Sequence, residues 1–165
     1  MPERPDHVDR ILAEWRRERP DLDVGAIGTL GRLFRAAALA DAALSEQLGE
    51  HGLRPGWFDL LAALRRAGAP YELNPTALMR ATLLSSGGMT KRLDRLAAAG
   101  LVERRPDPSD RRGTLVRLTR RGKQAIDKAV VTHVANEERL LESLTRDERR
   151  TLDGLLRVFL GGFEP

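Results

Sequence analysis

The sequence contains no cysteine, so disulfide bonds, thiolate catalysis and thiol-based redox sensing are all excluded. No stretch of it approaches the run of about 20 apolar residues that a membrane-spanning helix needs. The first ten residues, MPERPDHVDR, include no apolar segment like that of a secretory signal. We therefore expect a cytoplasmic protein that has no membrane partner.

Motifs typical of enzymes are missing as well. The three histidines are scattered, and no spacing among them indicates a metal site or a pair of catalytic base and nucleophile. Gly25, Gly28 and Gly31 match neither a dinucleotide-binding nor a phosphate-binding loop, and close helix packing explains them better. We predict no catalytic residue, no metal and no cofactor, and hence no enzyme.

What is present is a composition typical of a soluble globular protein. Of the 165 residues, 41% are hydrophobic and 32% are charged, which is enough apolar material for one domain with a real core. The net charge of +4 is unevenly distributed, because residues 85–123 contain eleven Lys or Arg and only four Asp or Glu. That segment carries +7 and the remainder −3, which points to a polyanionic partner. A solvated basic face is the alternative interpretation of the charge alone.

Hydrophobic periodicity predicts a mainly helical chain. Helices are expected over residues 6–19, 23–49, 55–68, 76–83 and 86–99, and again from residue 119 onward. The predicted N-caps are Asp23, Asn74 and either Ser85 or Ser86, and Thr145 forms a capping box with Glu148.

Two short strands are expected after the helix that ends near Gly100. Residues 101–105 and 114–118 read as strands, and the polar loop PDPSDRRG joins them, with Gly113 allowing a tight turn. A hairpin that follows two such helices is a wing. The predicted fold class is therefore mainly α with a small β-hairpin wing, a winged helix-turn-helix with N- and C-terminal dimerisation helices. We expect N-terminal helices over residues 1–50, a DNA-binding region over 51–119 and C-terminal helices over 120–165, in one intertwined domain.

The apolar stripes on the terminal helices predict a homodimer. Leu152, Leu155 and Phe159, for example, fall on one side of the last helix. Such stripes usually pack into a core, but helices at the two ends of this chain have few neighbours left to cover them. Two copies whose termini intertwine would bury these stripes.

The helix over residues 86–99 has two different faces when 100° is allowed per residue. Leu93 and Leu96 fall on the side that must face the core, whereas Lys91 and Arg95 point away from it, which suits entry into a major groove. An arginine at the hairpin tip suits the minor groove, where narrow A·T tracts concentrate negative potential. The predicted DNA-binding residues are Asn74, Thr76, Ser85, Ser86, Gly87, Gly88, Thr90, Lys91, Arg95, Arg111 and Arg112.

The segment SSGGMTKRLDRLAAAGLVERR, followed by DPSDRRGTLVRLTRRG, resembles the MarR family of bacterial regulators. The family's wing pattern D-x-R…V-x-LT is matched by Asp110, Arg112, Val116, Leu118 and Thr119. The resemblance implies a winged-helix homodimer that binds a pseudopalindromic operator in double-stranded DNA, acting as a repressor that a small ligand releases. The absence of cysteine argues against the members that respond to oxidation.

A narrower resemblance is to the urate-responsive, PecS-like branch, because DHVDRILAEWRRERPDLD is similar to the extra N-terminal helix of that branch. It implies that Trp15, Asp59 and Arg92 bind the effector, urate or a related aromatic anion. One further aspartate of the branch has no match in TALMRATLL. The residues by themselves leave other interpretations open. Trp15 lies on an apolar stripe that suits core or dimer packing, and Asp59 faces away from the core leucines as an exposed carboxylate. Arg92 flanks the core face of its helix, so it could turn inward or reach phosphate.

If Arg92 anchors a ligand behind the DNA-reading helix, ligand binding must act on the same helix that enters the groove, and DNA affinity falls through linkage.

The alternative function is a winged-helix module used only for protein contacts and without a ligand response. Such a module would lack the basic surface, since binding to phosphates needs several cations within reach.

Overall fold

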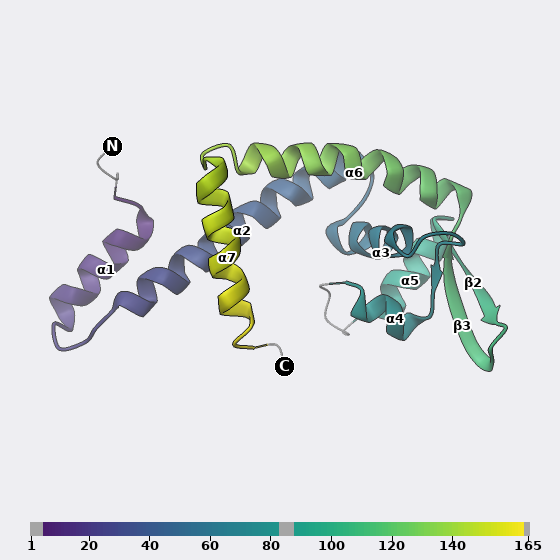
Figure 1. Cartoon of the computed structure of the whole chain (residues 1–165), viewed down its shortest axis with the longest axis horizontal. Coiled ribbons are helices and arrows are strands. Elements are labelled where there is room, and N and C mark those ends of the chain that lie inside the picture. The colour runs from purple at the N-terminus through teal and green to yellow at the C-terminus, as the bar shows by residue number, and fades with distance from the viewer. Residues whose placement is uncertain (1–4, 83–87, 164–165) are drawn as a thin grey trace. The chain divides into compact units, whose positions relative to one another are not determined.

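The computed structural model describes residues 5–82 and 88–163, and it describes Arg111 and Arg112 by their backbone only. The chain splits into two compact units, Met1–Ala43 and Leu44–Pro165, and each has a hydrophobic core of its own. The elements follow one another (Figure 1) in the order α1 (His7–Glu18), α2 (Gly25–Glu50), α3 (Pro55–Arg66), β1 (Glu72–Leu73), α4 (Pro75–Arg80), α5 (Met89–Ala98), β2 (Val102–Asp107), β3 (Asp110–Leu118), α6 (Arg120–Leu140) and α7 (Arg146–Leu160).

The first unit depends on a close contact between α1 and the start of α2. Val8 and Leu12 of α1 are buried together with Val24. A Cβ atom on Gly28 would lie 3.0 Å from a Leu12 methyl carbon, and one on Gly31 would lie 3.4 Å from Val8. Larger residues would hold the two helices apart, so the packing role predicted for Gly28 and Gly31 is confirmed.

Polar groups stabilise the same contact. Asp6 and Asp9 form a capping box at the start of α1, and Arg32 of α2 donates to their carboxylates at 2.8 and 2.6 Å. The backbone N–H of Asp9 and the Arg32 guanidinium hold the pKa of Asp6 below its ordinary value. Gly25 does not share the packing role predicted for it, because it begins α2, where its N–H donates to the carboxylate of Asp23 at 2.9 Å.

The core of the second unit surrounds α3. Leu60, Leu61 and Leu64 are fully buried because α4, α5, α6 and β3 all pack against this helix. The other fully buried large side chains come from these neighbours and from the end of α2, and they are Leu48, Leu78, Leu96, Val116 and Ile126. Since burying one such side chain contributes about 1.5–3 kcal/mol, this cluster is the main source of stability of the unit.

Three antiparallel strands form one sheet in the order β1-β3-β2. Val116 and Leu118 of β3 are buried and Arg117 between them is half-exposed, which is the alternation predicted for this strand. The sequence does not predict β1, because a strand of two residues has no periodicity to detect.

The predicted wing is present, but its turn lies elsewhere. β2 continues to Asp107 and β3 begins at Asp110, so both strands extend into the segment predicted as a loop. The tight turn falls at residues 108–109, where Asp107 accepts hydrogen bonds from the backbone N–H and the hydroxyl of Ser109 at 2.8 and 2.6 Å. The turn predicted at Gly113 is therefore wrong, because this glycine lies within β3.

The helix before the wing begins later than predicted. α5 starts at Met89, and its N-cap is Gly88 with a φ of 80°, a left-handed conformation that favours glycine. The predicted caps Ser85 and Ser86 lie outside the described residues. α4 is shorter than predicted and ends at Arg80.

The two C-terminal helices begin as the sequence predicts. Thr119 caps α6 by accepting the N–H of Gly122 at 2.9 Å, and Thr145 forms the predicted capping box with Glu148 at the start of α7. Within residues 5–82 and 88–163, no helix is both long and apolar enough to span a membrane.

Candidate nucleic-acid interface

α5 has the buried and exposed faces that its sequence predicts. Leu93 and Leu96 are buried in the core of the second unit. Thr90, Lys91 and Arg95 are exposed on the other side of the helix. Neither Lys91 nor Arg95 forms an ion pair with any side chain that the structure describes, so both cations are available to an outside partner.

The acidic residue of α5 is neutralised by the wing. Arg104 of β2 forms a salt bridge with Asp94, in which the Nη2 and Oδ1 atoms are 2.7 Å apart. Because both side chains are about half exposed, the pair contributes less than about 1 kcal/mol to stability. Its larger effect is electrostatic, since it cancels the negative charge that α5 would otherwise present beside Lys91 and Arg95.

The start of α4 offers hydrogen-bond donors. The Asn74 side-chain oxygen accepts the N–H of Ala77 at 2.8 Å and Pro75 is the first helical residue, so the predicted N-cap is confirmed. With the oxygen used by the cap, the amide N–H groups of Asn74 are left to offer to an acceptor. Thr76 is exposed beside it and adds a hydroxyl.

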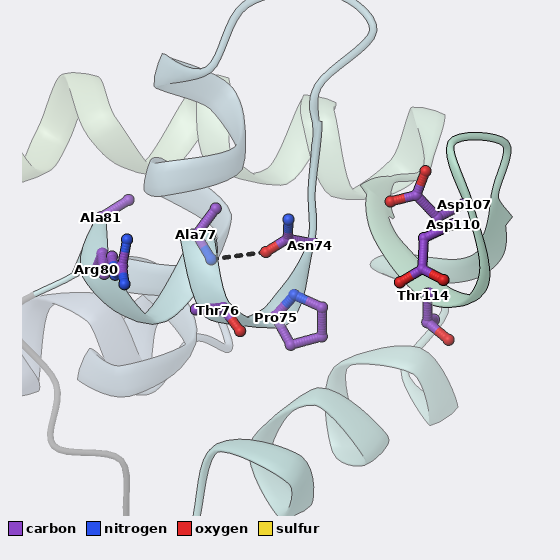
Figure 2. A pocket seen from close by; sticks show the side chains of 10 residues that line it. Asn74, Pro75, Thr76, Ala77, Arg80, Ala81, Asp107, Asp110 and Thr114 are labelled. Carbon is purple, nitrogen blue, oxygen red and sulfur yellow. Dashed lines mark hydrogen bonds between the residues drawn. The ribbon is translucent and has the colours of Figure 1, made fainter.

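An open groove of about 660 Å³ separates α4 from the wing. One partner lying along it would meet the start of α4 on one side and the hairpin on the other. Figure 2 shows the residues that line it, and the polar and charged ones among them are Asn74, Thr76 and Arg80 on the α4 side and Asp107, Asp110 and Thr114 on the wing side.

The turn of the wing is held by a carboxylate and a glycine. The hydroxyl and the backbone N–H of Ser109 hold the pKa of Asp107 below its ordinary value, so this side chain stays charged and keeps both hydrogen bonds. A Cβ atom on Gly113 would lie 2.8 Å from the Asp107 Cβ, closer than non-bonded carbons tolerate. Gly113 therefore allows the two strands to close directly below the turn.

Five of the predicted DNA-binding residues have no described side chain. The backbone places Arg111 and Arg112 in β3, just after the turn and therefore near the tip of the wing, as predicted. Ser85, Ser86 and Gly87 lie outside the described residues. The contacts of all five with DNA stay predictions.

The end of α5 and the start of α6 touch through their backbones. The hydroxyl of Thr119 donates to the carbonyl oxygen of Gly100 at 2.7 Å, and its N–H donates to that of Leu101 at 3.1 Å. A Cβ atom on Gly122 would overlap the Leu101 carbonyl oxygen. We call this contact of Gly100, Leu101, Thr119 and Gly122 the α5–α6 clasp. The predictions from the sequence do not include this contact, although a T-x-x-G pattern at a helix start that directly follows a strand, here Thr119 and Gly122, is a signal for it.

A second unpredicted cluster joins α3 to α6. Asp127 accepts hydrogen bonds from Lys123 and Arg65, both at 2.6 Å, and these two cations hold its pKa below its ordinary value. The Arg65 guanidinium carbon and the Lys123 ammonium nitrogen also lie 5.0 and 5.6 Å from the centre of the Tyr71 ring. These cations are engaged within the chain, so the cluster serves the fold.

The three predicted ligand residues fall in different units. Asp59 and Arg92 belong to the second unit, where both are half-buried and neither is free of partners. The exposed position expected for Asp59 is therefore wrong. Trp15 belongs to the first unit and is 43% exposed, so it is not a core residue of the chain. Binding of one ligand by all three residues stays a prediction.

Together, α4, α5 and the β2-β3 hairpin with an exposed cationic helix face define a winged-helix DNA-binding protein, as the sequence predicts. The MarR family profile matches residues 51–113. The HTH-type transcriptional regulator PecS of Dickeya dadantii is 40% identical over 149 residues, which cover 90% of each chain. The chain belongs to the MarR family and is a PecS-like transcriptional regulator, not an enzyme.

Solved structures agree with this assignment. A variant of MarR from Escherichia coli complexed with operator DNA has a TM-score of 0.73 and 32% sequence identity, over 83% of this chain and 97% of that one. Bordetella bronchiseptica BpsR, whose DNA binding is regulated by 6-hydroxynicotinic acid, has a TM-score of 0.72 and 26% identity, over 84% and 95%.

Proposed function

We propose that this chain is a homodimeric, ligand-responsive repressor that binds a pseudopalindromic operator. The exposed face of α5 is the observation that carries the DNA-binding mode. Its Lys91 and Arg95 have no ion-pair partner among the described side chains, and Leu93 and Leu96 hold the opposite face in the core. A helix fixed in this way can enter a major groove with its cations directed at phosphate or guanine.

The remaining contacts are assigned by position. Asn74 and Thr76 suit phosphate, because hydrogen-bond donors at a helix start commonly bind the DNA backbone. Arg111 and Arg112 suit the minor groove, since they follow the turn of the wing. Close approach of the backbone to the bases is assigned to Ser86, Gly87 and Gly88. Thr90 suits phosphate or a base, and Ser85 is assigned to the same DNA-binding surface.

The dimer is supported by the apolar side chains that each unit leaves exposed. In the second unit, Leu155 and Val158 of α7 are 64% and 79% exposed, and in the first unit Phe34 is 67% exposed. Apolar residues exposed in such numbers usually mark an interface. We assign dimerisation to residues 1–50 and 120–165 and DNA binding to residues 51–119. A two-fold dimer presents two copies of α5, which explains a pseudopalindromic operator.

The effector that we propose is urate or a related aromatic anion. Arg92 can pair with an anionic oxygen, Trp15 can stack on a planar ring, and Asp59 can accept from a ring N–H. The regulation of BpsR by 6-hydroxynicotinic acid, an aromatic heterocycle, supports this class of ligand. A ligand that favours a different placement of α5 lowers operator affinity by linkage.

One experiment tests operator and effector together. Genomic DNA fragments bound by the purified protein are sequenced after selection with and without urate, and the recovered operator drives a reporter gene. We expect one pseudopalindromic site, loss of its enrichment with urate, and higher reporter expression when the regulator is deleted. Enrichment unaffected by urate would exclude urate and leave DNA binding intact.

A salt series separates DNA binding from a protein-interaction module. The affinity for the recovered site is measured by fluorescence anisotropy at several salt concentrations. We expect log affinity to fall steeply with log salt, with a slope of about −0.9 for each phosphate contact. Absence of a complex at low salt would overturn the DNA-binding proposal.

A further inference from the structure

Arg92 differs from the other cations of α5 in where its side chain lies. It is half-buried, whereas Lys91 and Arg95 are exposed. Its side chain folds back over the first turn of α3, so that the position of a Cβ on Gly56 is only 3.1 Å from Arg92 Nε and 3.4 Å from Cδ. Its Nη1 atom is 3.8 Å from the Cβ position of Gly88, the N-cap of α5. We call this arrangement of Gly56, Gly88 and Arg92 the Arg92 slot.

Gly56 is needed for its missing side chain, which leaves space for Arg92, and not for the positive φ that glycine can adopt. Among the described glycines, those with a positive φ are Gly52, Gly68, Gly88 and Gly100, and Gly56 is not one of them. It is the second residue of α3, where a glycine is disfavoured relative to alanine by helix propensity. The missing side chain is therefore the property that the slot uses, because a methyl group would meet the Arg92 side chain.

The slot connects the start of α5 to the most deeply buried helix of the unit. α3 contributes Leu60, Leu61 and Leu64 to the core, so it is a fixed reference for its neighbours. The Arg92 side chain runs from the end of the first turn of α5 back past the N-cap of that helix to the start of α3. A displacement of the Arg92 guanidinium would therefore shift the first turn of α5, which is the end of the helix that approaches DNA in the proposed binding mode.

We propose that Gly56 is a positioning residue for operator binding: by leaving the slot open, it lets Arg92 hold the first turn of α5 in its DNA-binding position. This inference rests on the proposed function, since it assigns a role within the same interface. It differs from a phosphate contact, in which Arg92 would act by touching DNA. It also differs from simple packing, in which Gly56 would affect stability alone.

The first test is the Gly56→Ala variant. The atoms nearest to the added methyl belong to the Arg92 side chain, which has to shift by only a few tenths of an ångström, so we expect the variant to fold. Its melting temperature is measured beside its operator affinity, so that a loss of binding in the folded protein is separated from a loss of stability. Operator affinity is expected to fall by about 2- to 30-fold, the range typical of substitutions that act through a neighbouring residue. The matched control is Gly49→Ala in α2, which adds the same methyl group where nothing lies within 4 Å in the single chain. Because residues 1–50 are assigned to dimerisation, light scattering first verifies that this variant is dimeric, and its operator affinity is then expected to stay at the wild-type value.

The second test is a double-mutant cycle with Arg92→Met. If Gly56 acts through Arg92, then Gly56→Ala causes no further loss of affinity in the Arg92→Met background. Positioning also predicts that Arg92→Met lowers affinity at an unchanged salt slope, whereas loss of a phosphate contact would reduce the slope by about 0.9.

Three outcomes overturn the inference: a Gly56→Ala affinity equal to that of Gly49→Ala, additive losses in the double variant, or a reduced salt slope for Arg92→Met. Wild-type protein that binds no operator would instead overturn the proposed function, so the two failures are distinguishable.

Discussion

At the scale of single residues, Gly122 has the least space around it among the glycines that the structure describes. A Cβ atom there would overlap the carbonyl oxygen of Leu101, which is a backbone atom and cannot rotate away. We expect Gly122→Ala to lower the free energy of unfolding by about 3 kcal/mol, the upper range for overpacking. Urea unfolding followed by circular dichroism measures this change. Gly49→Ala, which meets nothing within 4 Å, is the control and should keep wild-type stability, whereas a Gly122→Ala variant of normal stability would contradict the α5–α6 clasp.

Asp127 gives a prediction about pH. Lys123 and Arg65 lower its pKa in the folded state, so the carboxylate stabilises the fold above its unfolded pKa of about 3.9, and this contribution is lost as pH falls through the lower folded value. We expect Asp127→Asn to be less stable than wild type at pH 7, by no more than about 1 kcal/mol because the groups are partly exposed. The difference should vanish in acid, where the wild-type carboxyl is protonated.

Thermal unfolding of both proteins from pH 7 to pH 2 measures this convergence. A melting-temperature difference that stays constant over the range would show that Asp127 acts by packing and not by charge. Gln124→Ala, a change at an exposed residue of the same helix, controls for substitution on α6 itself.

At the scale of elements, the wing is the part most sensitive to one added carbon. A Cβ atom on Gly113 would lie 2.8 Å from the Asp107 Cβ and 3.1 Å from the Asp110 carbonyl oxygen, so Gly113→Ala must open the hairpin near its turn. We expect operator affinity to fall by about 5- to 150-fold through the displaced arginines, the range for losing base contacts. The melting temperature should change little, because none of the described side chains at residues 107–110 belongs to the core.

Anisotropy titration with the recovered operator measures this loss. Thr114→Ser at the next position is the control, because it keeps the hydroxyl that lines the groove. Equal affinities of Gly113→Ala and Thr114→Ser would mean that the shape of the wing does not matter for binding.

Periodicity predicted most elements because it reports which face of a segment is buried. α1, α3 and the start of α7 agree with the prediction, and so do the two faces of α5. The start of α5 was misplaced because it depends on the left-handed backbone of Gly88, and several residues before it are also good caps. The turn was misplaced because Asp107 bonds to Ser109, a local choice that strand alternation does not encode.

The contacts that the sequence did not predict have one property in common, which is that they join residues far apart in the chain. In the clasp, Thr119 bonds to Gly100, 19 positions earlier, and in the α3–α6 cluster Arg65 bonds to Asp127 across 62 positions. Contacts between distant residues leave no periodic signal in the sequence, so hydrophobic periodicity did not predict them. The Arg92 slot is a third example, because Gly56 and Arg92 come from different helices.

At the scale of the whole molecule, the proposed dimer predicts that a charge introduced on the apolar side of α7 prevents dimerisation. Leu155 is 64% exposed in the single chain, so Leu155→Glu leaves the folded chain intact and places a charge in the proposed interface. We expect a monomer by light scattering and loss of tight operator binding, because one α5 alone can read only a half-site.

The control for this variant is Arg150→Glu, which introduces the same residue on the polar side of α7 and costs only an exposed ion pair with Asp147. This variant should stay dimeric and bind the operator normally. A dimeric Leu155→Glu protein would show that this part of α7 lies outside the interface.

The α5–α6 clasp closes the wing at its base. Thr119 and Gly122 hold the first turn of α6 against the end of α5. The first and last residues of the β2-β3 hairpin, residues 102 and 118, are therefore fixed in position relative to each other. In the proposed dimer, the reach of the hairpin toward the minor groove and the spacing of the two copies of α5 would therefore be set by different parts of the chain. Adding residues to the turn at 108–109, or removing them, would change the reach alone, so under this proposal the wing adapts to flanking DNA while the half-site spacing stays the same.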